Sequence, residues 1–96
     1  MSLRDKYDFD TLVNQSEREV LAELEVQLAR TPGLCTCQEC VLDMAAYALN
    51  KVRPAYRVSL MGSVYASAGA RGQHAREIAE AVREAIQKVK SNPSHD

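Results

Sequence analysis

Three cysteines lie within six residues of this chain, in the run Cys35-Thr36-Cys37-Gln38-Glu39-Cys40, and they are its only cysteines. This spacing brings three soft sulfur donors to one point, where thiolates repel one another unless a cation neutralises them. Tetrahedral zinc is the usual cation for such a set. The pattern therefore predicts a metal-binding turn. The alternatives are reduced or redox-active thiols without a metal, or a disulfide, which is disfavoured because a C-x-C bridge is strained and three is an odd number.

A closed structural zinc site has four ligands, and the cysteines supply three of them. We expect His74 to be the fourth, because a neutral imidazole is a good zinc ligand. The other candidates are a carboxylate of Glu39 or Asp43, His95 near the end of the chain, water, or a group from a second chain. A catalytic zinc would leave one position open, but no recognisable acid or base accompanies the cysteines, so we expect that the protein is not an enzyme.

Length and charge restrict the function further. A chain of 96 residues makes one domain with a modest core. Its net charge is −1, with acidic and basic residues mixed along the chain, which argues against general nucleic-acid binding. We see no apolar run long enough to cross a membrane and no signal-peptide pattern. Clustered thiols without a secretory signal predict a cytoplasmic protein.

Hydrophobic periodicity predicts three main helices, and the first precedes the cysteines. Asp8 or Asp10 can cap its start, unless a capping box at Ser16 delays the regular helix, and Thr31-Pro32-Gly33 ends it. The apolar side chains that share its predicted inner face are Phe9, Leu12, Val13, Val20, Leu21, Leu24 and Leu28.

The second and third predicted helices follow the cysteines. The second begins at Gln38 or Glu39, runs to about Lys51 and is apolar over a wide arc, as in a buried helix. Asp43 lies one turn beyond Cys40, where it can accept hydrogen bonds from the cysteine turn or simply face the helix start. The third helix covers about 73–90. Its apolar stripe comprises Ala75, Ile78, Ala79, Val82, Ala85, Ile86 and Val89.

The segment between the last two helices has a strand period. Apolar residues alternate with polar ones over 56–60, and 63–66 can form a second short strand. We therefore predict a mostly α (α+β) fold with three main helices, a short β-hairpin-like segment and a cysteine zinc turn, associating as a homodimer. Residues 1–7 are expected to be a disordered N-terminus or tag remnant, 8–90 a single domain, and 91–96 a flexible tail.

The sequence from Cys35 onward resembles the late competence development protein ComFB family. The resemblance extends over about residues 35–66, in the order Cys35, Cys37, Cys40, Asp43, Ala48-Leu49-Asn50, Pro54-x-Tyr56, Val58 and Val64-Tyr65. It implies a small, mostly helical, cytoplasmic bacterial protein that dimerises and carries zinc on its cysteines, without an established enzymatic activity. Some relatives are reported as cyclic dinucleotide receptors, which makes ligand binding an alternative function.

A possible site for such a ligand can be named from the sequence. Arginine pairs with phosphate in a bidentate manner and also stacks on bases, while tyrosine stacks on a purine. A dimer would present two copies of the set to a two-fold-symmetric ligand such as cyclic di-GMP or cyclic di-AMP. The alternative is a solvated surface with packed tyrosines. The residues concerned are Lys51, Arg53, Tyr56, Arg57, Tyr65 and Arg71.

Overall fold

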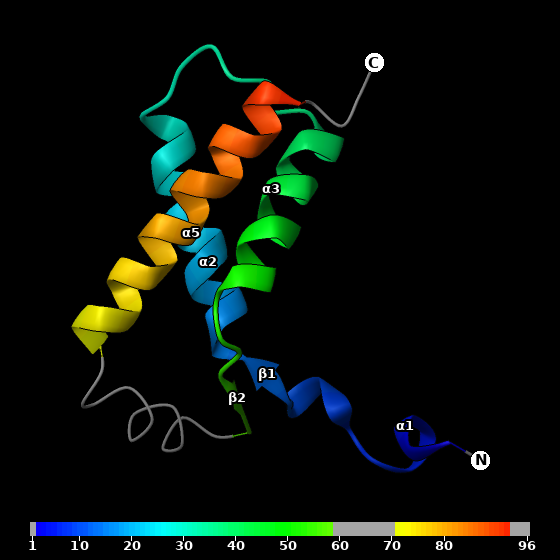
Figure 1. Ribbon diagram of the computed structural model, residues 1–96. Coiled ribbons are helices and arrows are strands. Elements are labelled where there is room, and N and C mark those ends of the chain that lie inside the picture. Colours follow the sequence, from blue (N-terminus) through cyan, green and yellow to red (C-terminus); the bar gives the residue numbers. More distant parts are fainter. Residues whose placement is uncertain (1, 59–70, 93–96) are drawn as a thin grey trace.

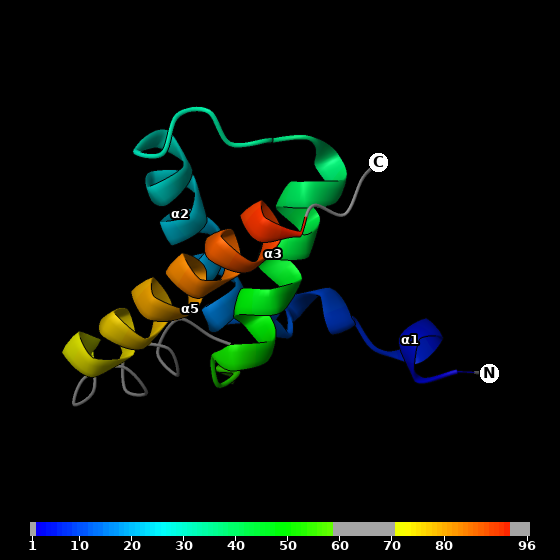
Figure 2. The ribbon, with the colours of Figure 1, turned by 45° about the horizontal axis from the view of Figure 1, so that its top comes forward.

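Three long helices form the body of the chain in the computed structural model, which describes residues 2–58 and 71–92. They are α2 (Gln15–Ala29), α3 (Gln38–Lys51) and α5 (Arg71–Ser91), and they confirm the three main helices that the sequence predicts. Helix α5 packs against both α2 and α3, and it runs in the direction opposite to α3 (Figures 1 and 2). The start of α3 and the start of α5 therefore lie at opposite ends of the body.

Helix α2 begins later than its apolar pattern suggests. The side chain of Asn14 caps it by accepting a 3.1 Å hydrogen bond from the backbone N–H of Ser16. Asp8 instead caps a short 3-10 helix, η1 (Phe9–Thr11), so the predicted helix start at Asp8 or Asp10 is wrong. The alternative start near Ser16 is confirmed, although Asn14 and not Ser16 is the N-cap. Because the chain bends between η1 and α2, residues before Gln15 do not continue the inner face of the helix.

The apolar face of α2 is correspondingly narrower than predicted. Val20 and Leu24 are buried and Leu28 is packed against the core, whereas Leu12 and Leu21 are exposed. Helix α2 ends at the predicted turn, where Gly33 has a φ of +89°, a left-handed conformation that glycine adopts without strain.

Helix α3 has the bounds that the sequence predicts, with Cys37 at its N-cap position. Cys40, Met44, Ala45 and Ala48 are buried on one face. Val41 and Leu49 also pack against the core, so the helix is covered over a wide arc as predicted, with Leu42 as the exception at 59% exposed.

Helix α5 buries a stripe at helical spacing, as predicted. Ala75 is exposed and Ala79 only partly buried, while Ala81, which the prediction omitted, is buried. The buried residues are Ile78, Ala81, Val82, Ala85, Ile86 and Val89. Together with the inner faces of α2 and α3 they form the hydrophobic core.

A two-stranded sheet joins segments that are far apart in the sequence. Strand β1 (Val13–Asn14) pairs antiparallel with β2 (Tyr56–Arg57), with Val13 opposite Arg57 and Asn14 opposite Tyr56. The predicted strand at residue 56 is therefore present but short, and its observed partner precedes α2. The predicted second strand, 63–66, lies outside the described residues. The sheet attaches the start of α2 to the chain that leaves α3.

The chain ends differ in part from the prediction. Helix α1 (Leu3–Lys6) is one helical turn within the segment expected to be disordered, and none of its residues is buried. It projects away from the body (Figure 1). At the other end, Ser91 still belongs to α5, and residues 93–96 of the expected tail lie outside the described residues. Within the described residues, none of the helices has both the length and the apolar character that crossing a membrane requires.

Candidate metal centre and candidate ligand pocket

The cysteines meet where the loop after α2 enters α3. Cys35 lies in the loop, Cys37 caps α3, and Cys40 lies in its first turn. A cap residue and the residue three positions later lie on the same side of a helix start. The three Sγ atoms all lie within 4.8 Å of one another. The predicted convergence of the sulfurs on one point is thus confirmed.

The thiols differ in how readily they lose a proton. Hydrogen bonds from the backbone and side chain of Cys37 lower the pKa of Cys35, and desolvation and the charge of Glu39 oppose this only in part. A backbone hydrogen bond from Cys40 lowers the pKa of Cys37, but desolvation and hydrogen bonds with Cys35, Cys40 and Glu39 outweigh it and raise that pKa to about 11. The cluster therefore favours a thiolate on Cys35 and disfavours a second thiolate on Cys37.

This donor set fits a zinc ion. With Zn–S bonds of about 2.3 Å, the sulfurs of a tetrahedral site lie about 3.8 Å apart. The observed spacing, up to 4.8 Å, requires only a small contraction. Within residues 2–58 and 71–92, these cysteines are the one set of three or more potential ligands that comes this close together. Cys40 is 1% exposed while Cys35 is exposed, so the cluster joins the core to the surface.

The structure does not bring His74 to the cysteines. His74 lies near the start of α5, at the other end of the body from the start of α3 (Figure 1). Its Nε2 lies 3.0 Å from Oε2 of Glu19 on α2, a contact without hydrogen-bond geometry that becomes an ion pair when the imidazole is protonated. Because α3 and α5 run in opposite directions, the fourth ligand expected of His74 is not available within one chain.

Asp43 lies one turn after Cys40 on α3, and its side chain is exposed. Its hydrogen bonding to the cysteine turn stays a prediction. The side chain of Glu39, which the sequence offered as an alternative ligand, helps to raise the pKa of Cys37.

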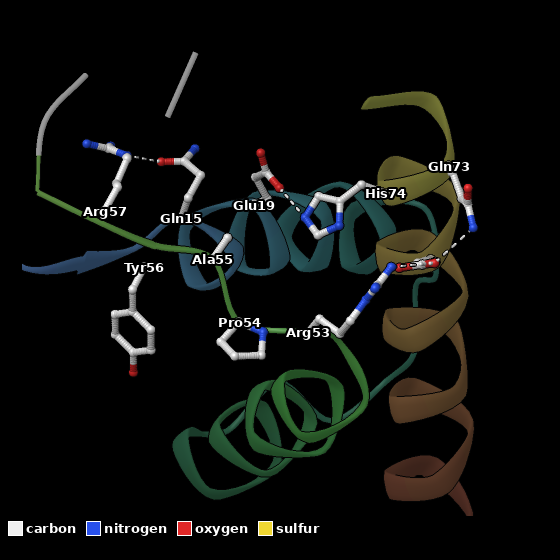
Figure 3. Close-up of a pocket in the computed structure, with 10 residues that line it drawn as sticks. Gln15, Glu19, Arg53, Pro54, Ala55, Tyr56, Arg57, Gln73 and His74 are labelled. Carbon is white, nitrogen blue, oxygen red and sulfur yellow. Dashed lines mark hydrogen bonds and ion pairs between the residues drawn. The ribbon is translucent and has the colours of Figure 1, made fainter. Parts of the chain in front are cut away.

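A separate pocket of about 270 Å³ lies between the start of α2, the chain after α3 and the first turns of α5 (Figure 3). Arg53, Tyr56 and Arg57, which we predicted from the sequence as ligand-binding residues, all line it. The remaining lining residues are Gln15, Glu19, Pro54, Ala55, Gln73, His74 and Glu77. Sequence reasoning missed most of these, because the pocket forms only when three distant segments pack together.

Hydrogen bonds hold the wall of this pocket in place. Ser16 Oγ donates a 2.6 Å bond to the carbonyl of Arg53, and the backbone N–H of Gln15 donates a 2.7 Å bond to the carbonyl of Ala55. The N–H of Ala55 in turn donates a 2.8 Å bond to Oδ1 of Asn14. The segment carrying Arg53, Tyr56 and Arg57 is therefore attached to the start of α2.

The pocket contains charges of both signs. Nη2 of Arg53 lies 3.7 Å from Oε1 of Glu77, and Nε of Arg57 donates a 3.0 Å hydrogen bond to Oε1 of Gln15. Tyr56 is 65% exposed, so its ring is available to a ligand. Glu19 and Glu77 make the pocket less cationic than the predicted arginine set alone.

The other predicted ligand residues are not part of this pocket as described. Nζ of Lys51 lies 3.7 Å from Oε2 of Glu84 and does not line the pocket. Tyr65 and the side chain of Arg71 lie outside what the structure describes. Their roles stay predictions.

Comparison with known proteins agrees with the resemblance seen in the cysteine region and extends it. The family model described as late competence development protein ComFB matches residues 13–93. A solved structure of the late competence protein ComFB from Bacillus subtilis is similar, with 30% identity and a TM-score of 0.70, over 86% of this chain and 92% of that one. No curated protein matches the sequence. The chain therefore belongs to the late competence development protein ComFB family.

Proposed function

We propose that this chain is a non-catalytic regulatory module in which zinc, held by Cys35, Cys37 and Cys40, organises the turn between α2 and α3. The observation that carries the proposal is the convergence of three Sγ atoms within 4.8 Å. Three thiolates form a soft, anionic donor set of the kind that selects zinc over harder cations. The fourth position is left to water, to Glu39, or to a group outside the described residues.

The location of the cluster suits a metal that fixes the loop between α2 and α3 to the core. Residues 34–37 form no helix or strand, so little regular hydrogen bonding holds this loop. Cys40 belongs to the hydrophobic core, whereas Cys35 lies on the loop. An ion shared by both residues connects the loop to the core. Its binding free energy thereby adds to the stability of the fold.

Metal analysis of the purified chain tests this proposal. Mass spectrometry under native conditions is expected to find about one zinc per chain, as for a structural site. Cys40→Ser should lose the metal, while His74→Ala, which changes the imidazole at the other end of the body, should retain it. A fully folded, metal-free wild-type chain that does not take up added zinc would refute the proposal.

We also propose that the module works in the cytoplasm as a homodimer. Large apolar side chains lie exposed on two helices of the single chain, including Leu21 and Val26 on α2 and Leu42 on α3. Such residues suit a surface that a second copy covers. Sedimentation equilibrium over a range of concentrations decides the oligomeric state, and a monomer at every concentration counts against the dimer.

A second candidate function, as a cyclic dinucleotide receptor, is favoured by the meeting of Arg53, Tyr56 and Arg57 at one pocket. The arginines suit the phosphates, and the exposed tyrosine suits a base. Glu19 and Glu77 disfavour phosphate, but a carboxylate accepts hydrogen bonds from base N–H groups. Guanine presents two adjacent donors, N1–H and N2–H, which one carboxylate can accept together, whereas adenine presents only N6–H beside an acceptor, so the mixed charge favours cyclic di-GMP over cyclic di-AMP.

Calorimetric titration with the two dinucleotides tests this second function. The double variant Arg53→Ala/Arg57→Ala should abolish binding of cyclic di-GMP. Lys51→Ala removes a positive charge from a nearby residue that does not line the pocket, and so serves as the matched control. Binding that Lys51→Ala weakens as strongly as the double variant would place the ligand elsewhere, and no heat with either dinucleotide would exclude this function.

A further inference from the structure

The three cysteines differ sharply in access to small molecules. Cys35 is exposed on the loop, Cys37 is half-buried at the helix cap, and Cys40 is 1% exposed. Coordination by a metal keeps cysteines deprotonated, and the thiolate is the form that peroxides oxidise. An oxidant that reaches the cluster from solvent therefore meets the sulfur of Cys35 first.

A second thiol lies within reach of an oxidised Cys35. Both other Sγ atoms lie within 4.8 Å, whereas a disulfide has an S–S distance of about 2.05 Å. Bridging Cys35 to Cys37 would close a strained C-x-C ring. Bridging it to Cys40 closes a larger ring, and Cys35 lies in a segment that no helix or strand hydrogen bonds hold in place. Cys40 is thus the better partner.

From this arrangement we propose that the cluster is a peroxide-sensitive switch, in which a Cys35–Cys40 disulfide replaces the bound metal. The proposal rests on the zinc site proposed above. Its oxidant is a hydroperoxide, with hydrogen peroxide as the simplest member of that class. The two states of the turn are a reduced form that binds metal and an oxidised form that does not.

The reaction balances in two steps. The sulfur of Cys35 attacks one peroxide oxygen, so an S–O bond forms, the O–O bond breaks, and the other oxygen leaves as water after taking up a proton. The sulfur of Cys40 then attacks the resulting sulfenic acid on Cys35, so the S–S bond forms and the S–O bond breaks, releasing a second water. In sum, two thiols and one hydrogen peroxide give one disulfide and two waters.

Metal loss follows from the ligand count. The disulfide removes two of the three sulfur donors, and Cys37 alone cannot hold the ion against water. A thiol reductant reverses the bridge, after which added zinc can bind again. The turn between α2 and α3 is tied to the core in both states, by an ion in one and by a covalent bond in the other.

The test uses the full-length, zinc-loaded chain. Hydrogen peroxide is added stepwise, zinc release is followed with a chromogenic chelator, and the protein is then cleaved after Glu39, which separates Cys40 from Cys35 and Cys37. We expect the amount of zinc released to rise in proportion to the amount of disulfide formed, until all of the zinc is lost. We expect this disulfide to link the two fragments through Cys35. Dithiothreitol with added zinc should restore the metal.

Two variants, compared without metal, separate the roles of the cysteines. Cys37→Ser should still form the disulfide with peroxide, whereas Cys35→Ser, which keeps only Cys37 and Cys40, should consume peroxide roughly tenfold more slowly, because its most accessible thiol is gone. Zinc retained under peroxide, or a bridge that contains Cys37, overturns the switch. A wild-type chain that never binds zinc refutes the proposed function instead, and the metal-free comparison then still decides whether the disulfide forms.

Discussion

Ser16 and Arg53 are 37 positions apart in the chain, yet the hydroxyl of Ser16 donates a 2.6 Å hydrogen bond to the backbone carbonyl of Arg53. Ser16 is 1% exposed, so this bond is shielded from water. It fixes the first turn of α2 to the segment that follows α3. Because Arg53 and Arg57 belong to that segment, the shape of the pocket depends on a contact outside its lining.

Replacing Ser16 by alanine should destabilise the fold. The carbonyl of Arg53 would lose its buried donor, and leaving a buried acceptor unsatisfied costs about 1–3 kcal/mol. Urea unfolding followed by circular dichroism measures the change in the free energy of unfolding. Ser91→Ala, at the exposed end of α5, is the control and should change it by less than about 0.5 kcal/mol. Equal midpoints for the two variants would show that the Ser16 bond contributes nothing.

The stability of the fold should depend on the side-chain oxygen of Asn14 but not on its side-chain nitrogen. Oδ1 accepts from the backbone N–H groups of both Ser16 and Ala55, at 3.1 and 2.8 Å. Asn14→Ala removes a helix cap, at a cost of about 0.5–2 kcal/mol, and also leaves the N–H of Ala55 without this partner. Asn14→Asp keeps a side-chain acceptor in place and is expected to retain most of the stability in the same urea experiment. A loss as large in Asn14→Asp as in Asn14→Ala would contradict the acceptor role.

Truncation of two apolar residues of α3 should change the stability of the fold by very different amounts. Met44 is 1% exposed within the core, so Met44→Ala should lower the free energy of unfolding by about 2–5 kcal/mol through lost packing and a residual cavity. Leu42 is 59% exposed, and Leu42→Ala should have little effect on unfolding of the monomer. Denaturation at low protein concentration measures the free energy of unfolding of both variants. If Leu42→Ala destabilises only at high concentration, Leu42 lies in a self-association surface.

The parts of the fold that the sequence predicts well depend on local patterns. The stripe of α5, the bounds of α3 and the clustering of the cysteines all follow from residues within a few turns of one another. Leu21 and Leu42 show the limit of this reasoning, since periodicity says that a side chain is apolar but not that a neighbouring helix covers it. Within the described residues, the three long helices cover only part of one another's apolar surface.

Long-range pairing explains most of what the sequence did not reveal. The partner of β2 is β1, more than forty residues earlier, and a pair of two-residue strands leaves almost no period-two signal. The capping role of Asn14 was readable in principle, because asparagine before a helix is a common N-cap. The position of His74 beside Glu19 was not readable, since it depends on the direction in which α5 packs against α2.

Removing the metal should lower the melting temperature of the zinc-loaded chain. A ligand that binds only the folded state stabilises it by mass action, and each kcal/mol lost shifts the melting temperature by about 4–8 °C in a domain of this size. Thermal unfolding with and without a strong chelator measures the shift. Cys40→Ser, which lacks a ligand, should show no chelator effect, and His74→Ala should show the full wild-type shift. A chelator shift that disappears in His74→Ala would mean that His74 holds the metal, for example across a dimer.

Alkylation of the metal-free chain should follow the order set by the thiol pKa values. The pKa of Cys35 is below its ordinary value of 9.0, so its reactive thiolate forms at lower pH, and the side chain is also exposed. The pKa of Cys37 is raised to about 11, so its thiolate appears only in alkaline solution. Iodoacetamide labelling at a series of pH values, mapped by fragmentation mass spectrometry, should therefore label Cys35 first near neutral pH and Cys37 only as the pH rises. In Cys37→Ala the side-chain hydrogen bond to Cys35 is lost while the backbone N–H of residue 37 remains, so the labelling of Cys35 should shift to somewhat higher pH. Labelling of Cys37 before Cys35 would contradict the assigned order, and no shift of Cys35 in the variant would show that the side chain of Cys37 does not stabilise its thiolate.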